Sequence, residues 1–360
     1  MNELGLSGTA VGNLVAVFSF VQLIVSPISG RFVDLYGRKS MITIGLIIFS
    51  ISEILFGLGK SAAILFLSRI LGGVSAAFIM PAVTAYIADI TTNEMRPKAL
   101  GYMSAAISTG FIIGPGIGGF LADIHIRLPF FFAGAIAFLA ATSSLLFLKE
   151  QERGEPVGVI PNHRMSSFRQ IVSEKYFIAF LILFISSFAL AAFESLFSLF
   201  VDRKFGFSPK DIAIIVTGGA LLGAIFQIAL FDRFTKWWGE IRLIRYCLIF
   251  SAILVYSMTI VYTYASILFV TIILFIGFDL IRPALTTYLS RIAGNEQGFV
   301  AGMNSMFTSI GYVLGPIVGG ALFDVELNYP FYFAVIMLAI AIVLAYRWKE
   351  ASEQVSQEPH

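Results

Sequence analysis

Three charged side chains lie inside long apolar segments, where an unpaired charge is costly. Glu194 lies in the apolar run 176–200, and Asp279 and Arg282 lie in the run 266–289. Because a charge at the centre of a bilayer costs about 2.5–3.5 kcal/mol on insertion scales, such residues usually have a function. A carboxylate there can bind and release a proton, and its charged form attracts cations. Glu194, Asp279 and Arg282 are therefore the first candidates for proton exchange.

The residues around these charges indicate polar helix faces. Two stripes have helical spacing, namely Ser187, Ala191, Glu194 and Ser198 in the first run and Phe275, Asp279, Arg282 and Thr286 in the second. Small and polar neighbours suit a helix face that lines a wet cavity. Asp279 and Arg282 are three residues apart, so they can pair with each other, or Asp279 can be released to take a proton. The alternative is a static buried ion pair that only fixes helix packing.

Further cavity candidates combine amides, hydroxyls, methionine and aromatic rings. The residues expected to line the substrate cavity are Glu194, Gln22, Arg69, Met103, Phe278, Asn304, Phe307 and Thr308. Gln22 continues a stripe of serines on its own helix. Polarizable surfaces of this kind repack around different ligands, while a carboxylate attracts positive charge. In a chain with 36 Phe, however, any single ring is more often packing or lipid-facing.

The elements that position these residues must be helices that cross a membrane. The chain has 360 residues, of which 58% are hydrophobic and only 13% charged, and its mean hydropathy is +0.88. A soluble domain carries about a quarter charged residues. At about 20 residues per bilayer crossing, the apolar runs give eleven helices. We expect them near 9–29, 41–59, 62–88, 99–121, 129–148, 176–200, 211–231, 243–262, 266–289, 298–322 and 329–347.

Several classes of function lack the residues they need. One cysteine, Cys247, excludes a thiolate metal site, and the three histidines lie in predicted loops or the tail and do not favour a histidine site, so no metal or cofactor is expected. An intramembrane His or Cys nucleophile constellation is also missing, so an enzyme is not expected. The net charge of +2 does not favour nucleic-acid binding.

One short segment is similar to a phosphate-binding loop. The sequence Gly57-Leu-Gly59-Lys60-Ser61 agrees with the last residues of the pattern G-x-x-x-x-G-K-[ST]. However, Ile54 stands at the position where the pattern requires its first glycine. The segment also lies in a turn between apolar helices rather than after a strand. ATP is therefore not expected as the direct fuel, and an ion gradient is the remaining common source.

The distribution of basic residues predicts the orientation in the membrane. When alternate loops are assigned to opposite sides, seventeen of the 24 basic residues fall on one face and five on the other, and Arg69 and Arg282 fall inside spans. By the positive-inside rule the first face is cytoplasmic. The C-terminus is then inside and Met1 outside.

A long polar stretch divides the chain into two halves. The expected organisation is an N-terminal bundle over 1–148, a cytoplasmic linker over 149–175, a C-terminal bundle of six helices over 176–348 and a cytoplasmic tail over 349–360. Residues 110–119 match residues 311–320 at an offset of 201, and the register continues beyond them. Parallel repeats of this size are how two-bundle transporters are built. Convergent helix-packing glycines are the alternative.

The repeat also accounts for the odd number of spans. Residues 4–7 align with residues 205–208, so the helix at 176–200 has its partner before residue 1. We therefore expect an all-α integral membrane protein of two pseudo-symmetric six-helix bundles, with the first helix absent from this chain through a misplaced start or a real truncation.

The first predicted cytoplasmic loop combines glycines, a carboxylate and several bases. Gly30 and Gly37 permit a tight turn, in which Asp34 faces Arg38. The loop resembles the signature G-x-L-x-D-R-x-G-R-[RK] of the major facilitator superfamily, in which the aspartate is part of a cytoplasmic gate. Leu35 departs from it, because the signature usually has a base there. The alternative is a basic anchor with a glycine turn.

Two helix patterns resemble the same superfamily. The fourth-helix pattern is matched by Leu65, Arg69, Gly73, Ala76 and Ala77. The fifth-helix pattern G-x-x-x-G-P-x-x-G-G of its drug:proton antiporters is matched by Gly110, Gly114, Pro115, Gly118 and Gly119, and is repeated around Gly315 and Pro316. Glycines four apart let helices approach closely and proline kinks the helix, so the pattern favours a tight, adjustable seal. A plain packing motif is the alternative.

The segments 193–200, 275–284 and 302–311 narrow the resemblance to the Bmr/Blt/NorA multidrug efflux transporters, over about residues 4–348. This resemblance implies a multidrug:proton antiporter of the bacterial plasma membrane that works by alternating access. Glu194 and Asp279 would hold protons in one state and attract lipophilic cationic drugs in the other. The alternatives are a facilitator that imports a small polar solute and a truncated membrane protein with no transport cycle.

Overall fold

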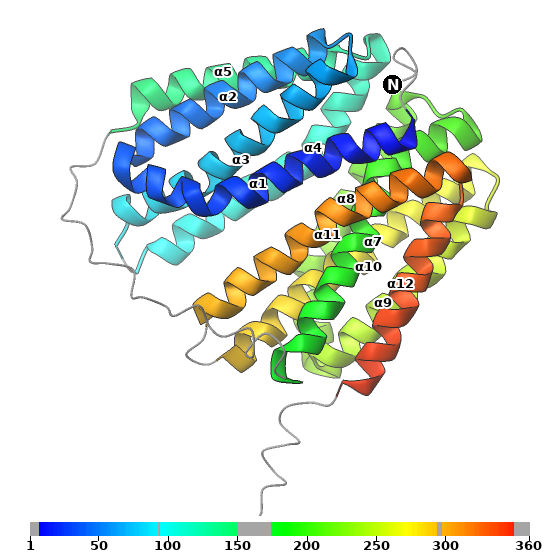
Figure 1. Ribbon diagram of the computed structural model, residues 1–360. Helices are drawn as coiled ribbons and strands as arrows, with labels where there is room; N and C mark the ends of the chain where they lie inside the picture. Colours follow the sequence, from blue (N-terminus) through cyan, green and yellow to red (C-terminus); the bar gives the residue numbers. More distant parts are fainter. Residues whose placement is uncertain (1–6, 93, 150–173, 294–296, 349–360) are drawn as a thin grey trace, which may run out of the picture. The chain divides into compact units, whose positions relative to one another are not determined.

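Eleven helices make up most of the described chain in the computed structural model, which describes residues 7–92, 94–149, 174–293 and 297–348 (Figure 1). The helices are α1 Gly8–Tyr36, α2 Arg38–Leu58, α3 Ala62–Ile90, α4 Arg96–Ile124, α5 Leu128–Phe147, α7 Glu174–Phe205, α8 Pro209–Trp238, α9 Glu240–Ile260, α10 Tyr264–Ala293, α11 Gln297–Val325 and α12 Tyr329–Arg347. All eleven are long and apolar enough to cross a bilayer. A helix satisfies its own backbone hydrogen bonds, which lipid cannot do. The predicted all-α membrane fold is confirmed for these residues.

The chain divides into two compact units. Unit 1 comprises Met1–Leu6, Asn13–Ile160 and Ser208–Ile214, and unit 2 comprises Ser7–Gly12, Pro161–Phe207 and Ile215–His360. The predicted linker at 149–175 lies almost wholly outside the described residues.

Small polar residues join the helices of unit 1. In Figure 1, α2 lies beside both α3 and α5, and these are the two closest helix pairs of the unit. The Ser50 hydroxyl donates to the Gly134 carbonyl oxygen at 2.8 Å, and the Ser75 hydroxyl donates to the Gly45 carbonyl oxygen at 2.9 Å. Without a hydrophobic force between helices in lipid, such contacts and close packing hold the helices together.

Glycines on α11 let this helix pack closely on α7 in unit 2. A Cβ built on Gly315 would lie 2.5 Å from the Phe188 carbonyl oxygen and 3.0 Å from the Ala192 nitrogen. Gly311 and Gly319 make similar close approaches to α7. The α7–α11 pair is the most extensive helix contact in the structure. The repeated fifth-helix pattern therefore serves as a packing seam in this unit.

The equivalent glycines of α4 have no such neighbours. Among the described residues, no atom outside the helix itself lies within 4 Å of a Cβ built on Gly110, Gly114 or Gly118. Gly119 differs, because its Cβ would meet Ala213 and the Pro209 carbonyl oxygen. Within unit 1, therefore, Gly110, Gly114 and Gly118 make no close helix contact of the kind that α11 makes with α7 in unit 2.

The turn that follows α1 depends on one glycine rather than two. Helix α1 continues through Gly30 to Tyr36, and the chain turns at Gly37, which has φ 91°. Gly239, which precedes α9 in the second unit, has φ 75°. Backbone of positive φ strains every residue except glycine. The expectation that Gly30 takes part in the turn was wrong, since its backbone stays helical.

Each of these two turns is followed by an ion pair, and the two pairs have opposite polarity. In unit 1, Arg38 at the start of α2 binds Asp89 near the end of α3, with Nε and Oδ2 2.9 Å apart. In unit 2, Glu240 at the start of α9 binds Arg291 near the end of α10, with Oε2 and the guanidinium nitrogen 3.0 Å apart. The positive end of a helix dipole is its N-terminus, so both dipoles favour the pair in unit 2 and oppose the pair in unit 1.

Exchanging the two charges of the second pair should lower the stability of the protein. The double variant Glu240→Arg, Arg291→Glu keeps opposite charges in contact but places both against the helix dipoles. Each exchange loses a favourable interaction of about 0.3–1 kcal/mol and adds an unfavourable one of similar size, so for the two helix ends we expect a loss of about 1.2–4 kcal/mol. The midpoint of thermal unfolding in one detergent checks this. A double variant as stable as the parent chain would show that the dipoles contribute nothing here.

Candidate proton and substrate site

Helix α7 presents an accessible polar strip at Glu194 and Ser198, within a mostly buried stretch of the helix. Phe193, Leu196 and Phe197 are at most 2% exposed, whereas Glu194 and Ser198 are exposed. The predicted stripe through Glu194 is therefore shorter than expected. Ser187 and Ala191 are buried, because the glycine seam of α11 packs directly on them.

Asp279 on α10 is the acidic neighbour of Glu194. The two carboxylates are close enough to interact electrostatically, and the Tyr312 hydroxyl of α11 interacts with both of them and with Arg282. Asp279 is half-buried and Arg282 exposed. Among the described residues, no ion pair within 4.0 Å joins Asp279 to Arg282. Asp279 is thus not held in the static pair that the sequence left open.

Tyr312 is a member of this cluster that the sequence analysis missed. It lies on α11 one residue after Gly311, which packs on α7. The close approach of these two helices brings the hydroxyl near Glu194. No local pattern distinguishes this tyrosine from the other twelve in the chain, and only the helix packing identifies it.

The cavity residues predicted on α11 lie near the same helices but differ in exposure. The Asn304 side-chain nitrogen donates to the Thr286 hydroxyl of α10 at 3.3 Å. Within the described residues, the Asn304 carbonyl oxygen and the Thr308 hydroxyl are buried without a hydrogen-bond partner. Phe307 stacks on Phe180, with ring centroids 5.4 Å apart. Unpaired buried polar atoms are rare and suit a site that binds water or a ligand.

Phe278 does not line an open surface. Its side chain is 3% exposed, and the neighbouring Gly277 lies against Ser251 and Phe250 of α9. This side of α10 therefore faces the interior of unit 2. The place of Phe278 in the substrate cavity stays a prediction, and in this structure its side chain is covered within unit 2.

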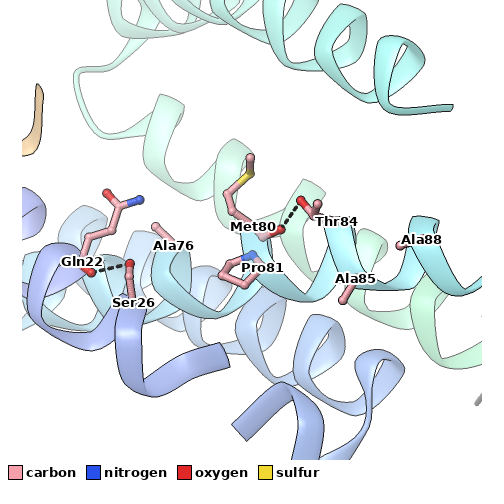
Figure 2. Close-up of a pocket in the computed structure, with 8 residues that line it drawn as sticks. All are labelled: Gln22, Ser26, Ala76, Met80, Pro81, Thr84, Ala85 and Ala88. Carbon is pink, nitrogen blue, oxygen red and sulfur yellow. Dashed lines mark hydrogen bonds between the residues drawn. The ribbon is translucent and has the colours of Figure 1, made fainter. Parts of the chain in front are cut away.

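Unit 1 contains a separate open pocket between α1 and α3, with a volume of about 520 Å³. Figure 2 shows its lining residues, which are Gln22, Ser26, Ala76, Met80, Pro81, Thr84, Ala85 and Ala88. The Ser26 and Thr84 hydroxyls are bonded to the carbonyl oxygens of Gln22 and Met80 in their own helices. The Gln22 amide remains the polar group of a mainly apolar surface. A volume of this size suits a drug-sized molecule.

Arg69 lies elsewhere in unit 1, in the contact between α2 and α3. Its guanidinium nitrogen is 3.5 Å from the Glu53 carboxylate, and its Cζ lies 4.1 Å from the centre of the Phe56 ring. Beside this pair, Ser52 and Ser68 donate hydrogen bonds to each other's carbonyl oxygens at 2.8 and 2.9 Å. Arg69 was expected in the substrate cavity, but these contacts join it to a neighbouring helix, and it is not among the lining residues of the pocket.

Replacing Glu53 with Gln should destabilise the protein strongly. The variant leaves the mostly buried charge of Arg69 without its counter-charge, which costs about 3–5 kcal/mol when such a pair is broken from one side. We expect the double variant Glu53→Gln, Arg69→Met to recover most of that loss. Thermal unfolding of the single and double variants checks this. If the double variant is no more stable than Glu53→Gln, the ion pair is not the source of the effect.

The remaining predicted residues are placed as follows. Met103 is half-buried on α4. Gly30 and Asp34 lie in α1, and the burial of both residues lies outside what the structure describes. Arg38 pairs with Asp89, and its guanidinium also donates to the Val33 carbonyl oxygen at 3.4 Å. Over the described ranges, no group of three or more His, Cys, Asp or Glu residues could hold a metal ion.

Comparison with known proteins finds the same architecture and similar sequences. The profile of the Major Facilitator Superfamily matches residues 1–294 and 179–360. Multidrug resistance protein 1 of Bacillus subtilis (strain 168) is 66% identical over 349 residues, which cover 97% of this chain and 90% of that protein. Quinolone resistance protein NorA of Staphylococcus aureus is 42% identical over 359 residues, covering 99% and 92%.

A solved structure gives the same fold at lower sequence identity. The crystal structure of a bacterial homologue of the human lysosomal transporter Spinster, inward-facing and occupied, has a TM-score of 0.77 at 18% identity and covers 97% of this chain and 91% of that one. At this identity the likeness concerns the fold alone.

Proposed function

Since this chain belongs to the Major Facilitator Superfamily, we propose that it exports lipophilic, often cationic drugs and dyes in exchange for protons. The similarity to proteins named for multidrug and quinolone resistance supports this choice of substrates. The observation that carries the proton exchange is the cluster of Glu194, Asp279, Arg282 and Tyr312 inside the membrane-spanning helices of unit 2.

In this proposal, charge exchange links the proton to the drug. With Glu194 and Asp279 ionised, the site holds negative charge in a low-dielectric region and attracts a lipophilic cation. Protonation of the carboxylates removes the counter-charge, so the cation leaves. Proton binding and drug binding thus shift the equilibrium between the protonated and the ionised site in opposite directions. Antiport by alternating access requires this opposition. Arg282, three residues from Asp279, limits how much negative charge the empty site carries.

The pocket of unit 1 is by itself a candidate apolar binding surface for a drug. Met80 and the alanines of α3 offer polarizable and apolar contacts, and the Gln22 amide can donate or accept a hydrogen bond. A surface with few fixed polar partners accepts ligands of different shape, as broad specificity requires.

The test is transport by the purified chain in sealed lipid vesicles. Vesicles loaded with acidic buffer are diluted into neutral buffer that contains a fluorescent lipophilic cation such as ethidium, without ATP. We expect accumulation of the dye that a protonophore abolishes, and no accumulation in vesicles without a pH gradient. Dye movement that ignores the gradient would contradict proton exchange. Transport of a small polar solute with no response to the dye would favour an importer.

The proposed orientation places the C-terminus in the cytoplasm of a bacterial cell. Its support is the excess of basic residues on that face. A tag fused after His360 should resist protease in intact protoplasts and be cut in inverted vesicles. Cleavage in intact protoplasts would reverse the orientation.

A further inference from the structure

Helix α8 meets the Asp279 face of α10 with two glycines. A Cβ built on Gly219 would collide with the Phe275 ring, and one built on Gly223 would collide with the Asp279 carboxylate oxygen Oδ2. Both glycines are buried. Each pair of residues is four apart on its helix, so two successive turns of α8 contact two successive turns of α10. The helices are therefore matched in register at this crossing.

Phe275 fixes the distance between the two helices. Its ring is 8% exposed and packs edge-to-face on Phe193 of α7, with centroids 5.9 Å apart. Phe193 is itself 2% exposed and lies next to Glu194. Because neither ring has free space, α8 is held at the distance that Gly219 allows. The space in front of Gly223 is then set by the packing, and the Asp279 carboxylate occupies it.

We propose that Gly223 is a positioning residue for Asp279. By having no side chain, Gly223 leaves room for the Asp279 carboxylate to lie between α8 and α10 in a position from which it interacts with Glu194. This inference rests on the proposed function, in which Asp279 exchanges protons. The titratable and charged groups that interact within this cluster are Glu194 of α7, Tyr312 of α11 and Arg282 of α10.

A methyl group at position 223 should displace the carboxylate without unfolding the protein. The nearest atoms are the carboxylate oxygen and the Asp279 Cγ, at the far end of a side chain that can rotate, and they are not backbone. Alanine also has a helix propensity about 1 kcal/mol better than glycine. Rotation takes the carboxylate away from its position beside Glu194. The altered interaction between the two acids should then change proton binding.

Gly218 supplies the matched control. It lies on α8 one residue before Gly219, and a Cβ there would be 3.4 Å from the Ile272 Cδ1 atom, which is an ordinary contact. Gly218→Ala and Gly223→Ala carry the same change in helix propensity. A difference between them therefore reports the space for Asp279 and not the loss of a glycine.

The experiment measures binding of ethidium to each purified full-length variant as a function of pH. We expect Gly218→Ala to behave as the parent chain, and Gly223→Ala to bind the dye about tenfold more weakly at neutral pH, about 1.4 kcal/mol, with a displaced pH midpoint. A purely structural role would lower the melting temperature but leave the midpoint unchanged. Equal midpoints and affinities in both variants would overturn the proposal.

Two further variants keep the outcome decisive. In an Asp279→Asn background, Gly223→Ala should cause no additional change in the pH midpoint, because the two residues act as one unit. If Gly223→Ala does not fold, the double variant Gly223→Ala, Asp279→Ala should fold, since the carboxylate that blocks the methyl group is gone. If neither folds, the collision is not with Asp279 and the proposal fails. Failure of the proposed function is distinguishable, because the parent chain would then show no pH-dependent binding.

Discussion

Replacing Asp279 with Asn stops proton-driven export of a lipophilic cation while the protein stays folded. Asparagine has nearly the same shape as aspartate but can neither carry charge nor exchange a proton at neutral pH. Asp279 forms no ion pair with Arg282 in the described chain. Replacing its carboxylate therefore does not leave a buried positive charge without a counter-charge. We expect dye accumulation in acid-loaded vesicles to fall at least about tenfold, to the level seen with protonophore.

Two controls separate this effect from general damage. Asp123→Asn removes a carboxylate at the exposed end of α4 and should transport as the parent chain does. Glu194→Gln should resemble Asp279→Asn, and the double variant should be little worse than either single one, because the two carboxylates form one site. Proton-dependent transport that persists in both single variants would remove these residues from the coupling mechanism.

Gly315→Ala should lower the stability of the protein by forcing α7 and α11 apart. Its new methyl group would lie 2.5 Å from a backbone oxygen of α7, and backbone atoms cannot rotate away. The two helices must separate, which weakens the most extensive contact of the structure. Overpacking of this kind typically costs about 1–3 kcal/mol, and the gain in helix propensity offsets about 1 kcal/mol of it. A collision with backbone atoms belongs at the upper end of the range for overpacking, so we expect the free energy of unfolding to fall by about 2 kcal/mol in total.

Gly302→Ala on the same helix is the matched control. Among the described residues nothing lies within 4 Å of a Cβ at Gly302, and the propensity gain is the same. We expect it to match or exceed the parent in the midpoint of thermal unfolding. If both alanine variants unfold at one temperature, the seam between α7 and α11 is not a determinant of stability.

The positions of the helices could be predicted from the sequence, because lipid imposes a strict rule on each segment. A run of apolar residues long enough to cross the bilayer must be helical, whatever packs beside it. Glu194 and Asp279 can be identified in the same way. A carboxylate inside an apolar run is costly in lipid whatever its neighbours are, so its presence there indicates a function. These inferences needed only local information.

The inferences that failed needed knowledge of neighbouring helices. Arg69 and Phe278 were predicted to line the cavity, but Arg69 pairs with Glu53 of the neighbouring helix, and the side chain of Phe278 is buried in the interior of unit 2. Tyr312 and Gly223 reach the acidic cluster only through close helix crossings. Gly30 was placed in a turn because two glycines flank the loop, although only Gly37 adopts positive φ. Spacing along one helix does not contain this information.

The two ion pairs after Gly37 and Gly239 show what kind of constraint acts on them. A gene duplication that produced both halves would have given them the same charges at first. Arg38 with Asp89 and Glu240 with Arg291 are now reversed, although the turns and the helix ends still correspond. The contact between these helix ends therefore requires opposite charges, and it does not require a given sign on either helix. A lineage can pass from one polarity to the other through an intermediate with neutral residues, and homologues with either polarity in either half are expected.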